Sequence, residues 1–145
     1  MDQKFQFFSE DYPFTPKSKG KLRLWLTSVI VKENKIPWYI NFIFCSDDYL
    51  LELNRNYLKH DTLTDVITFP FGDDDVNVSG DIYISIPRVK ENAEKFGQEF
   101  DYELQRVMVH GVLHLLGYKD KTKSAKSEMT AKENLYLAWI PAIFL

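Results

Sequence analysis

The sequence predicts a single α+β domain, in which a mixed sheet of about four strands is packed with about five helices. The chain has 145 residues, enough for one domain with a substantial core and too few for two. Strand-like and helix-like segments are mixed without strict β-α alternation, a pattern typical of helices packed on a sheet. The chain contains no internal repeat, low-complexity tract or linker-like stretch. We therefore expect residues 1–145 to form one domain.

The first half of the chain contains two predicted strands and two predicted helices. A short first strand is expected at residues 4–8, and apolar residues at helical spacing predict an amphipathic helix at 19–35. Residues 38–45 (WYINFIFC) are rich in aromatic and β-branched side chains, which predicts a buried strand. Ser46 precedes two acidic residues, so it is a good N-cap for a helix that extends to Leu58.

Two further strands are predicted at residues 64–71 and 80–86. Isoleucine alternates with other residues from 82 to 86, as a sheet with one buried face requires. The loop at 72–80 joins the two strands, so we expect them to form a long-looped hairpin.

Three helices are predicted in the rest of the chain. Proline opens the first, at residues 87–96, and Gly97 can end it. The second runs from about 101 to 118 and is apolar around most of its circumference, so we expect it to be central and buried. The last, at about 123–139, precedes the helix-breaking Pro141.

Composition and charge exclude several classes of protein. The formal net charge of -3 argues against a nonspecific nucleic-acid binder, although it leaves room for a local basic patch. Cys45 is the only cysteine, so we expect no disulfide partner and no multi-cysteine metal site. Residues 1–12 do not resemble a secretory signal, and the apolar end at 135–145 is too short to span a bilayer. We expect a cytoplasmic protein without a membrane partner.

Two histidines lie four residues apart on the helix predicted at 101–118. They belong to a stripe whose members follow one another at i+3 or i+4: Glu103, Arg106, His110, His114 and Gly117. Side chains so spaced have Cβ atoms about 5–6 Å apart. Two imidazoles there can reach one metal ion with bonds of about 2.0–2.1 Å.

A third ligand has to come from outside this stripe. Gly117 can take the left-handed conformation that ends a helix, and the turn can bring Asp120 toward the two rings. Either histidine alone would more often be a satisfied core or surface residue. The pair, followed by a glycine and a carboxylate, favours a metal site at His110, His114 and Asp120. Gly111 adds slight support, because glycine inside a helix costs about 1 kcal/mol relative to alanine and close packing would explain it.

The helix motif resembles that of a known family. Residues 110–120 (HGVLHLLGYKD) resemble the signature H-G-x-L-H-L-x-G-Y-D-H of the YbeY-type endoribonucleases of bacterial ribosomal RNA maturation, and match it through the tyrosine. Residues 53–71 (LNRNYLKHDTLTDVITFPF) resemble the family's L-N-x-x-Y-R-x-x-D-x-P-T-D-V-L-S-F-P, and residues 80–85 (GDIYIS) its G-D-I-x-I-S strand. Residues 128–137 (EMTAKENLYL) are similar to its closing helix, with its Met and Glu.

The resemblance implies cleavage of single-stranded ribosomal RNA near one bound divalent ion, zinc above all, with ribosomal particles as partners. The three ligands His110, His114 and Asp120 would leave a fourth coordination position open for water or a phosphate oxygen. No side chain is identified as the general base.

Four positions depart from the family pattern. Asp120 stands where the family places its third histidine, and Lys119 where it has an aspartate. A carboxylate can replace an imidazole on zinc, although its charge should make a bound water less acidic. Leu58 replaces an arginine, and the neighbouring Lys59 lacks the planar fork that binds phosphate through two bonds. Leu63 replaces a proline, which is a milder change in turn rigidity.

Other polar residues near these motifs are assigned more ordinary roles. His60 is a rival third ligand, but a solvated loop histidine is the favoured interpretation. Thr64, Asp65 and Asp61 are expected to cap or pin a turn, and Asp65 is also a candidate partner that orients a histidine. The acidic run at 73–75 is expected to be a surface turn rather than a cation site.

Lysines beside the candidate site are candidate contacts for RNA. Lys119, Lys121, Lys123 and Lys126 lie directly beside the proposed site in the sequence, and Lys59 follows the position of the family arginine. Phosphate binding needs cations near the metal, so these lysines are favoured over basic runs elsewhere.

Three functions are compatible with these residues. The leading hypothesis is a metal-dependent endoribonuclease. A small metallo-hydrolase of another class, such as a peptidase, is the second, but Gly111 replaces the glutamate base of the H-E-x-x-H peptidases. The third is a non-catalytic ribosome-associated binding protein with a structural metal, which the substitutions at Asp120 and Leu58 make more plausible.

Overall fold

The computed structural model describes residues 4–60, 63–72 and 74–144. It confirms the predicted α+β class, with four strands, five helices of ten or more residues and one further short helix within this part of the chain. In chain order the elements are β1 (Phe5–Ser9), α1 (Lys19–Lys32), β2 (Ile36–Cys45), α2 (Asp47–Tyr57), β3 (Val66–Pro70), β4 (Asn77–Ser85), α3 (Ile86–Lys95), α4 (Phe100–Leu115), α5 (Lys123–Leu137) and α6 (Ile140–Phe144).

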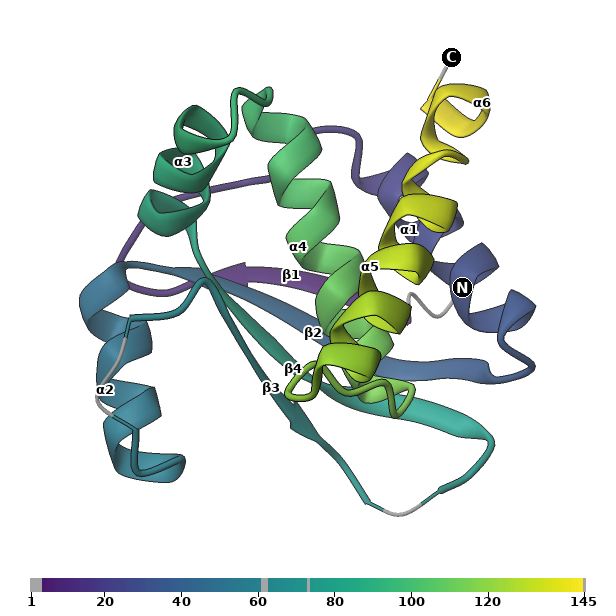
Figure 1. Cartoon of the computed structure of the whole chain (residues 1–145), viewed down its shortest axis with the longest axis horizontal. Helices are drawn as coiled ribbons and strands as arrows, with labels where there is room; N and C mark the ends of the chain where they lie inside the picture. Colours follow the sequence, from purple (N-terminus) through teal and green to yellow (C-terminus); the bar gives the residue numbers. More distant parts are fainter. Residues whose placement is uncertain (1–3, 61–62, 73, 145) are drawn as a thin grey trace.

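The four strands form one mixed sheet in the order β1-β2-β4-β3. β1, β2 and β4 run parallel, while β3 pairs antiparallel with β4 and so forms the predicted hairpin. β1 and β3 are the two edge strands (Figure 1).

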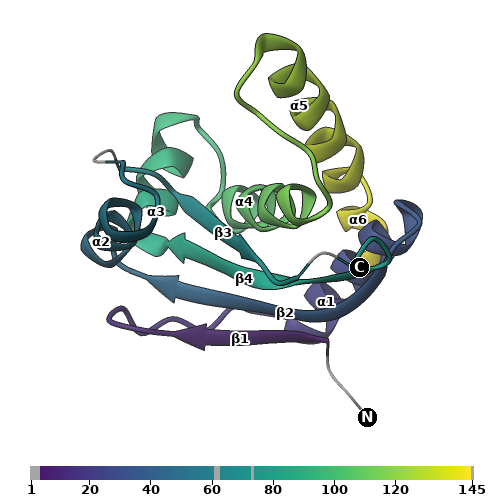
Figure 2. The ribbon, with the colours of Figure 1, turned by 90° about the horizontal axis from the view of Figure 1, so that it is seen from below.

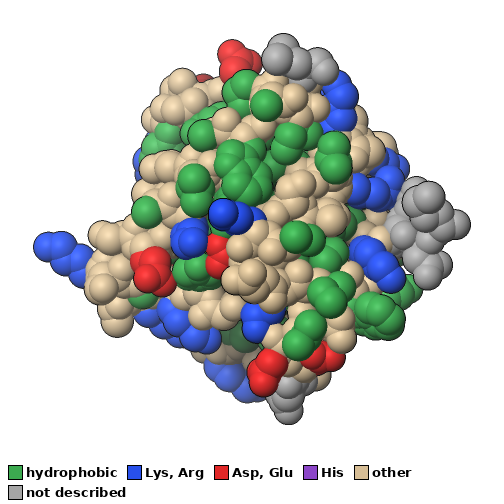
Figure 3. Space-filling model, turned by 90° about the vertical axis from the view of Figure 1, so that its right-hand side faces the viewer, with side chains coloured by type: hydrophobic (Ala, Val, Ile, Leu, Met, Phe, Trp, Pro, Cys, Tyr) green, Lys and Arg blue, Asp and Glu red, His purple; other side chains and the backbone are tan. Residues whose placement is uncertain are grey.

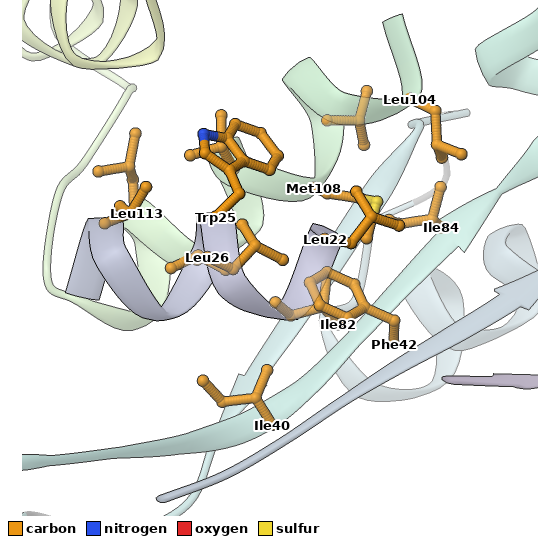
Figure 4. Close-up of a cluster of buried hydrophobic side chains, with 14 of the residues drawn as sticks. Leu22, Trp25, Leu26, Ile40, Phe42, Ile82, Ile84, Leu104, Met108 and Leu113 are labelled. Atoms are coloured by element: carbon orange, nitrogen blue, oxygen red, sulfur yellow. The ribbon is translucent and has the colours of Figure 1, made fainter. Parts of the chain in front are cut away.

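The main core lies between one face of this sheet and the helices α1 and α4. Side chains of α1, β2, β4 and α4 point toward one another there (Figure 4), and those labelled are Leu22, Trp25, Leu26, Ile40, Phe42, Ile82, Ile84, Leu104, Met108 and Leu113. α5 lies beyond α4 as seen from the sheet (Figure 2), and the indole of Trp25 donates a hydrogen bond to the backbone oxygen of Tyr136 at 2.8 Å. The second core cluster, Cys45, Leu50 and Ile67, lies under α2.

Several predicted boundaries were wrong, and strand pairing explains two of them. β2 begins at Ile36 instead of 38, and β4 begins at Asn77, inside the predicted loop, because these two segments pair with each other. α1 ends at Lys32, since Asn34 has a φ of 63°. Pro141, expected to break the helix, lies instead in the first turn of α6. A proline is tolerated there because the N–H groups of a first turn have no partner within the helix.

The surface formed by α1 and α6 carries apolar side chains. Figure 3 shows the side of the molecule that lies on the right in Figure 1; hydrophobic side chains, in green, gather there, and no histidine is visible. Leu24 and Val31 of α1 are 58% and 56% exposed. No helix within the described ranges is long and apolar enough to cross a membrane.

Candidate metal centre

α4 holds both histidines of the motif in the interior of the fold. Its sheet-facing residues are fully buried, and the imidazole side chains of His110 and His114 are 16% and 23% exposed on another stripe of the helix. A Cβ atom on Gly111 would lie 2.7 Å from the Cγ2 atom of Ile82 in β4. Close packing of α4 on the sheet therefore explains the glycine, as predicted.

A turn after α4 returns the chain to the histidines. Gly117 has a φ of +106°, a conformation that favours glycine, and its N–H donates to the His114 carbonyl at 3.0 Å. The carboxylate oxygen Oδ2 of Asp120 lies 3.3 Å from Nε2 of His110 and 3.2 Å from Nε2 of His114. The position of Gly117 in the sequence had predicted that Asp120 lies close to the two histidine rings.

A partly buried carboxylate at the end of α1 anchors the same turn. Glu33 accepts a hydrogen bond from the Tyr118 hydroxyl at 2.6 Å and from Nζ of Lys132 at 3.0 Å, and the Tyr136 hydroxyl also donates to it. Its neighbours lower the pKa of Glu33 despite the opposing effect of burial, so the carboxylate is charged. Tyr118 is two residues from Asp120, so this cluster restrains the loop that carries the carboxylate.

The three converging atoms have the spacing of a metal ligand set. Nε2 of His110 and Nε2 of His114 are 3.1 Å apart, so the three mutual distances lie between 3.1 and 3.3 Å. Tetrahedral bonds of about 2.0–2.1 Å would hold ligand atoms about 3.3–3.4 Å apart. His110, His114 and Asp120 can therefore hold one small divalent ion after a slight outward movement of the side chains.

Glu133 of α5 fixes the tautomer of His110. Its Oε2 atom lies 2.5 Å from Nδ1 of His110, and its side chain is only 7% exposed. A carboxylate accepts and cannot donate, so Nδ1 carries the proton and Nε2 presents its lone pair to the centre. Hydrogen-bonded partners of this kind orient metal-binding histidines.

Arg106 links Glu133 to the helix. Its guanidinium lies 3.3 Å from Oε1 of Glu133 and 2.5 Å from Oε2 of Glu103, whose side chain is 2% exposed. The hydrogen bond to Glu103 raises the pKa of Arg106, so the cation persists at any physiological pH. The stripe noted in the sequence therefore contains both the histidines and the charge pair that supports them.

The partner of His110 is not the candidate that the sequence suggested. Asp65 was the candidate, but its carboxylate lies 3.7 Å from Arg106 and 3.5 Å from the amide of Asn92. Burial raises the pKa of Asp65, while the charges of Arg106 and His110 oppose this shift. Glu133 takes the place next to His110. Its segment resembles the family's closing helix, but its contact with His110, 23 residues away in the chain, depends on the packing of α5 against α4.

The protonation state of His114 suits a ligand. Burial lowers the pKa of His114, and the neighbouring His110 lowers it further against the attraction of Asp120. The neutral imidazole is therefore favoured at neutral pH, as metal binding requires.

The three groups open into a cavity of about 510 Å³ between α2, β3, α4 and the loop before α5. Leu58, His60 and Lys121 also line it. His60 is exposed and contributes no atom to the converging group, which agrees with the solvated interpretation. An apolar side chain thus occupies the wall where the family resemblance places an arginine.

The remaining predicted residues lie outside the centre. Lys59, Lys119 and Lys123 are exposed, and none of the three lines the cavity. Asp74 accepts backbone hydrogen bonds at 2.8 and 3.0 Å, as a turn residue does, whereas Asp61 and Asp73 lie outside the described residues. Thr64 lies before β3, and its hydroxyl donates to Val66 O at 3.4 Å.

Comparison with known proteins identifies the family. The profile of the family described as Endoribonuclease YbeY matches residues 9–140. The chain belongs to the Endoribonuclease YbeY family.

Individual relatives agree over most of their length. An Endoribonuclease YbeY of Flavobacterium psychrophilum is 50% identical over 127 residues, which cover 88% of this chain and 90% of that protein. One from Amoebophilus asiaticus is 48% identical, covering 90% of this chain and 89% of the relative. A solution structure of a Thermotoga maritima protein matches with a TM-score of 0.63 and 33% identity, over 93% of this chain and 89% of that one.

Proposed function

We propose that this protein is a metal-dependent endoribonuclease that hydrolyses phosphodiester bonds of single-stranded RNA in ribosomal RNA maturation. The observation that carries the proposal is the convergence of Nε2 of His110, Nε2 of His114 and the Asp120 carboxylate within 3.1–3.3 Å at an open cavity. Membership of the Endoribonuclease YbeY family supports the assignment of RNA as substrate.

The chain's own residues prepare the centre for one ion, which we assign as zinc. His114 offers a neutral nitrogen, and Glu133 holds the ring of His110 in one tautomer. Asp120 adds a charged oxygen, and two nitrogens with one carboxylate is a known zinc ligand set. When bound, such an ion polarises a phosphoryl group and activates water near neutral pH.

Lysines on and beside the cavity wall are the proposed contacts for the RNA backbone. Lys121 lines the cavity, and Lys119, Lys123 and Lys59 are exposed residues of the adjoining loops and helix start. Leu58 gives no charge to this wall, so phosphate binding depends more on these lysines than the family pattern implies. Ribosomal particles in the cytoplasm are the proposed setting.

A cleavage assay with a matched pair of variants tests the proposal. The wild type, reconstituted with zinc, should cut a labelled single-stranded RNA and leave casein intact. Asp120→Ala should lose both bound metal and cleavage, whereas Asp75→Ala, which removes an exposed aspartate of the β3–β4 loop, should keep both. Metal retained by Asp120→Ala would refute the ligand assignment. Metal-loaded wild type that stays on ribosomal particles but cuts no RNA would instead indicate a binding protein with a structural metal.

A further inference from the structure

The outer edge of β3 carries backbone groups that do not pair with β4. The register places Val66 opposite Ile84 and Thr68 opposite Ile82. Just outside the two ends of β3, Ser85 N donates to Asp65 O and Phe71 N donates to Ser79 O, both at 3.0 Å. Hydrogen-bonded pairs alternate along an antiparallel ladder, so residues 65, 67, 69 and 71 face β4. The N–H and C=O groups of Val66 and Thr68 therefore point away from the sheet.

These outward groups border the candidate metal centre. Val66 and Thr68 line the same cavity as His110, His114 and Asp120. Within the described ranges, neither N–H group donates a hydrogen bond to another protein group, and the only contact on this edge is the long one from the Thr64 hydroxyl to the Val66 carbonyl. Two donors and the Thr68 carbonyl are thus available to a ligand in the cavity.

We propose that this edge of β3 binds the sugar–phosphate backbone of single-stranded RNA and leads it to the metal centre. The N–H groups of Val66 and Thr68 donate to successive phosphates, and the Thr68 carbonyl accepts from a ribose 2′-hydroxyl. This inference rests on the proposed function and adds the element that selects RNA. The edge of a sheet is a recognised anion-binding concavity, and backbone N–H groups are frequent phosphate contacts.

The spacing of the outward N–H groups supports a nucleic acid as the occupant. Outward N–H groups two residues apart on a strand are separated by about 6.8 Å, comparable with successive phosphates of an extended strand. Lys121 also lines the cavity and can contact a phosphate, whereas Arg106 is already bound to Glu103 and Glu133.

A peptide is the other class of ligand that strand edges bind. It is disfavoured here for two reasons. Pro70 is the next outward residue and has no N–H, which ends the row of donors after Thr68. The Val66 carbonyl is already contacted by Thr64. A peptide strand would need free N–H donors and free C=O acceptors along a longer stretch of the edge.

The test is a proline scan of two sheet edges. Thr68→Pro removes an outward N–H and the threonine hydroxyl but no hydrogen bond to β4, a change that an edge strand tolerates. Thr68→Val removes the hydroxyl and keeps the N–H. Ser9→Pro is the matched control, because Ser9 is an exposed residue of β1, the opposite edge strand. The backbone groups of Lys4 and Glu10 bond to β2, so by alternation the backbone of Ser9 faces outward, like that of Thr68. KM and kcat are measured with single-stranded RNA, and the inhibition constant with DNA of the same sequence.

Thr68→Pro should raise KM for RNA and the inhibition constant of DNA by the same factor, about tenfold for one lost bond to a charged acceptor. The wild type should prefer RNA to DNA, and the variant should keep that preference because its carbonyl is intact. Thr68→Val and Ser9→Pro should match the wild type. If Thr68→Pro does not fold, an amide-to-ester replacement of the same N–H gives the same test.

An unchanged KM in folded Thr68→Pro, with the wild type active, would overturn the edge assignment and leave the proposed function standing. Equal losses in Thr68→Pro and Ser9→Pro would also overturn it. Displacement of RNA by an extended peptide in the wild type but not in Thr68→Pro would assign the edge to peptides. A wild type that neither cuts nor binds RNA would refute the proposed function itself.

Discussion

Replacement of Glu133 by glutamine isolates the charge that supports the metal centre. The carboxylate lies 2.5 Å from Nδ1 of His110, and glutamine has the same shape and can still accept this proton through its amide oxygen. A net hydrogen bond to a charged group is worth about 1.5–3 kcal/mol and one between neutral groups about 0.5–1.5 kcal/mol. The loss of about 1–1.5 kcal/mol corresponds to about tenfold weaker metal binding.

Complete removal of the partner should cost more. Glu133→Ala frees the ring of His110 to rotate and to adopt the other tautomer, and loss of such partners typically weakens metal binding about 10–100-fold. Arg106 keeps its bond to Glu103 in both variants, so the network is reduced and not destroyed.

Competition with a chromophoric zinc chelator measures these affinities. Glu128→Gln is the matched control, because Glu128 is an exposed residue of the same helix. The wild type and Glu128→Gln should bind zinc equally tightly, Glu133→Gln more weakly, and Glu133→Ala most weakly. Equal zinc affinity in the wild type and in folded Glu133→Gln would show that the reasoning about His110 is incorrect.

Two further predictions concern the fold. Gly111→Ala should lower the free energy of unfolding by about 1–2 kcal/mol in urea titrations, because its Cβ would lie 2.7 Å from Ile82. Gly20→Ala is the control and should be neutral or stabilising, because a Cβ there would have nothing within 4 Å. A more stable Gly111→Ala would contradict the packing argument. Burial raises the pKa of the Cys45 thiol to about 12, with Asp11 and Asp47 adding to the shift. The thiol is therefore protonated at pH 8 and should react with a disulfide reagent only after unfolding, and prompt reaction in native buffer would disprove this.

The histidine pair and the turn after it were accessible from the sequence because they are local features. Helical spacing sets the relation of His110 to His114, and Gly117 has the conformational freedom that reverses the chain. Asp120 follows within three residues, so its approach requires no knowledge of the rest of the fold.

Features that depend on distant packing were missed. Glu133 reaches His110 only because α5 packs against α4, and the first residues of β4 are extended because they pair with β2. The outward edge of β3 likewise follows from the register with β4, which no property of residues 66–70 alone determines. In each case the deciding contact joins two different elements of the fold.

Anomalous diffraction from crystals of the zinc-loaded protein is the most direct measurement of the central claim. Data collected on both sides of the zinc absorption edge should show one peak per chain, at about 2.0–2.2 Å from Nε2 of His110, Nε2 of His114 and a carboxylate oxygen of Asp120. No peak at this position, or a zinc peak elsewhere with the Asp120 carboxylate turned away from both rings, would contradict the account.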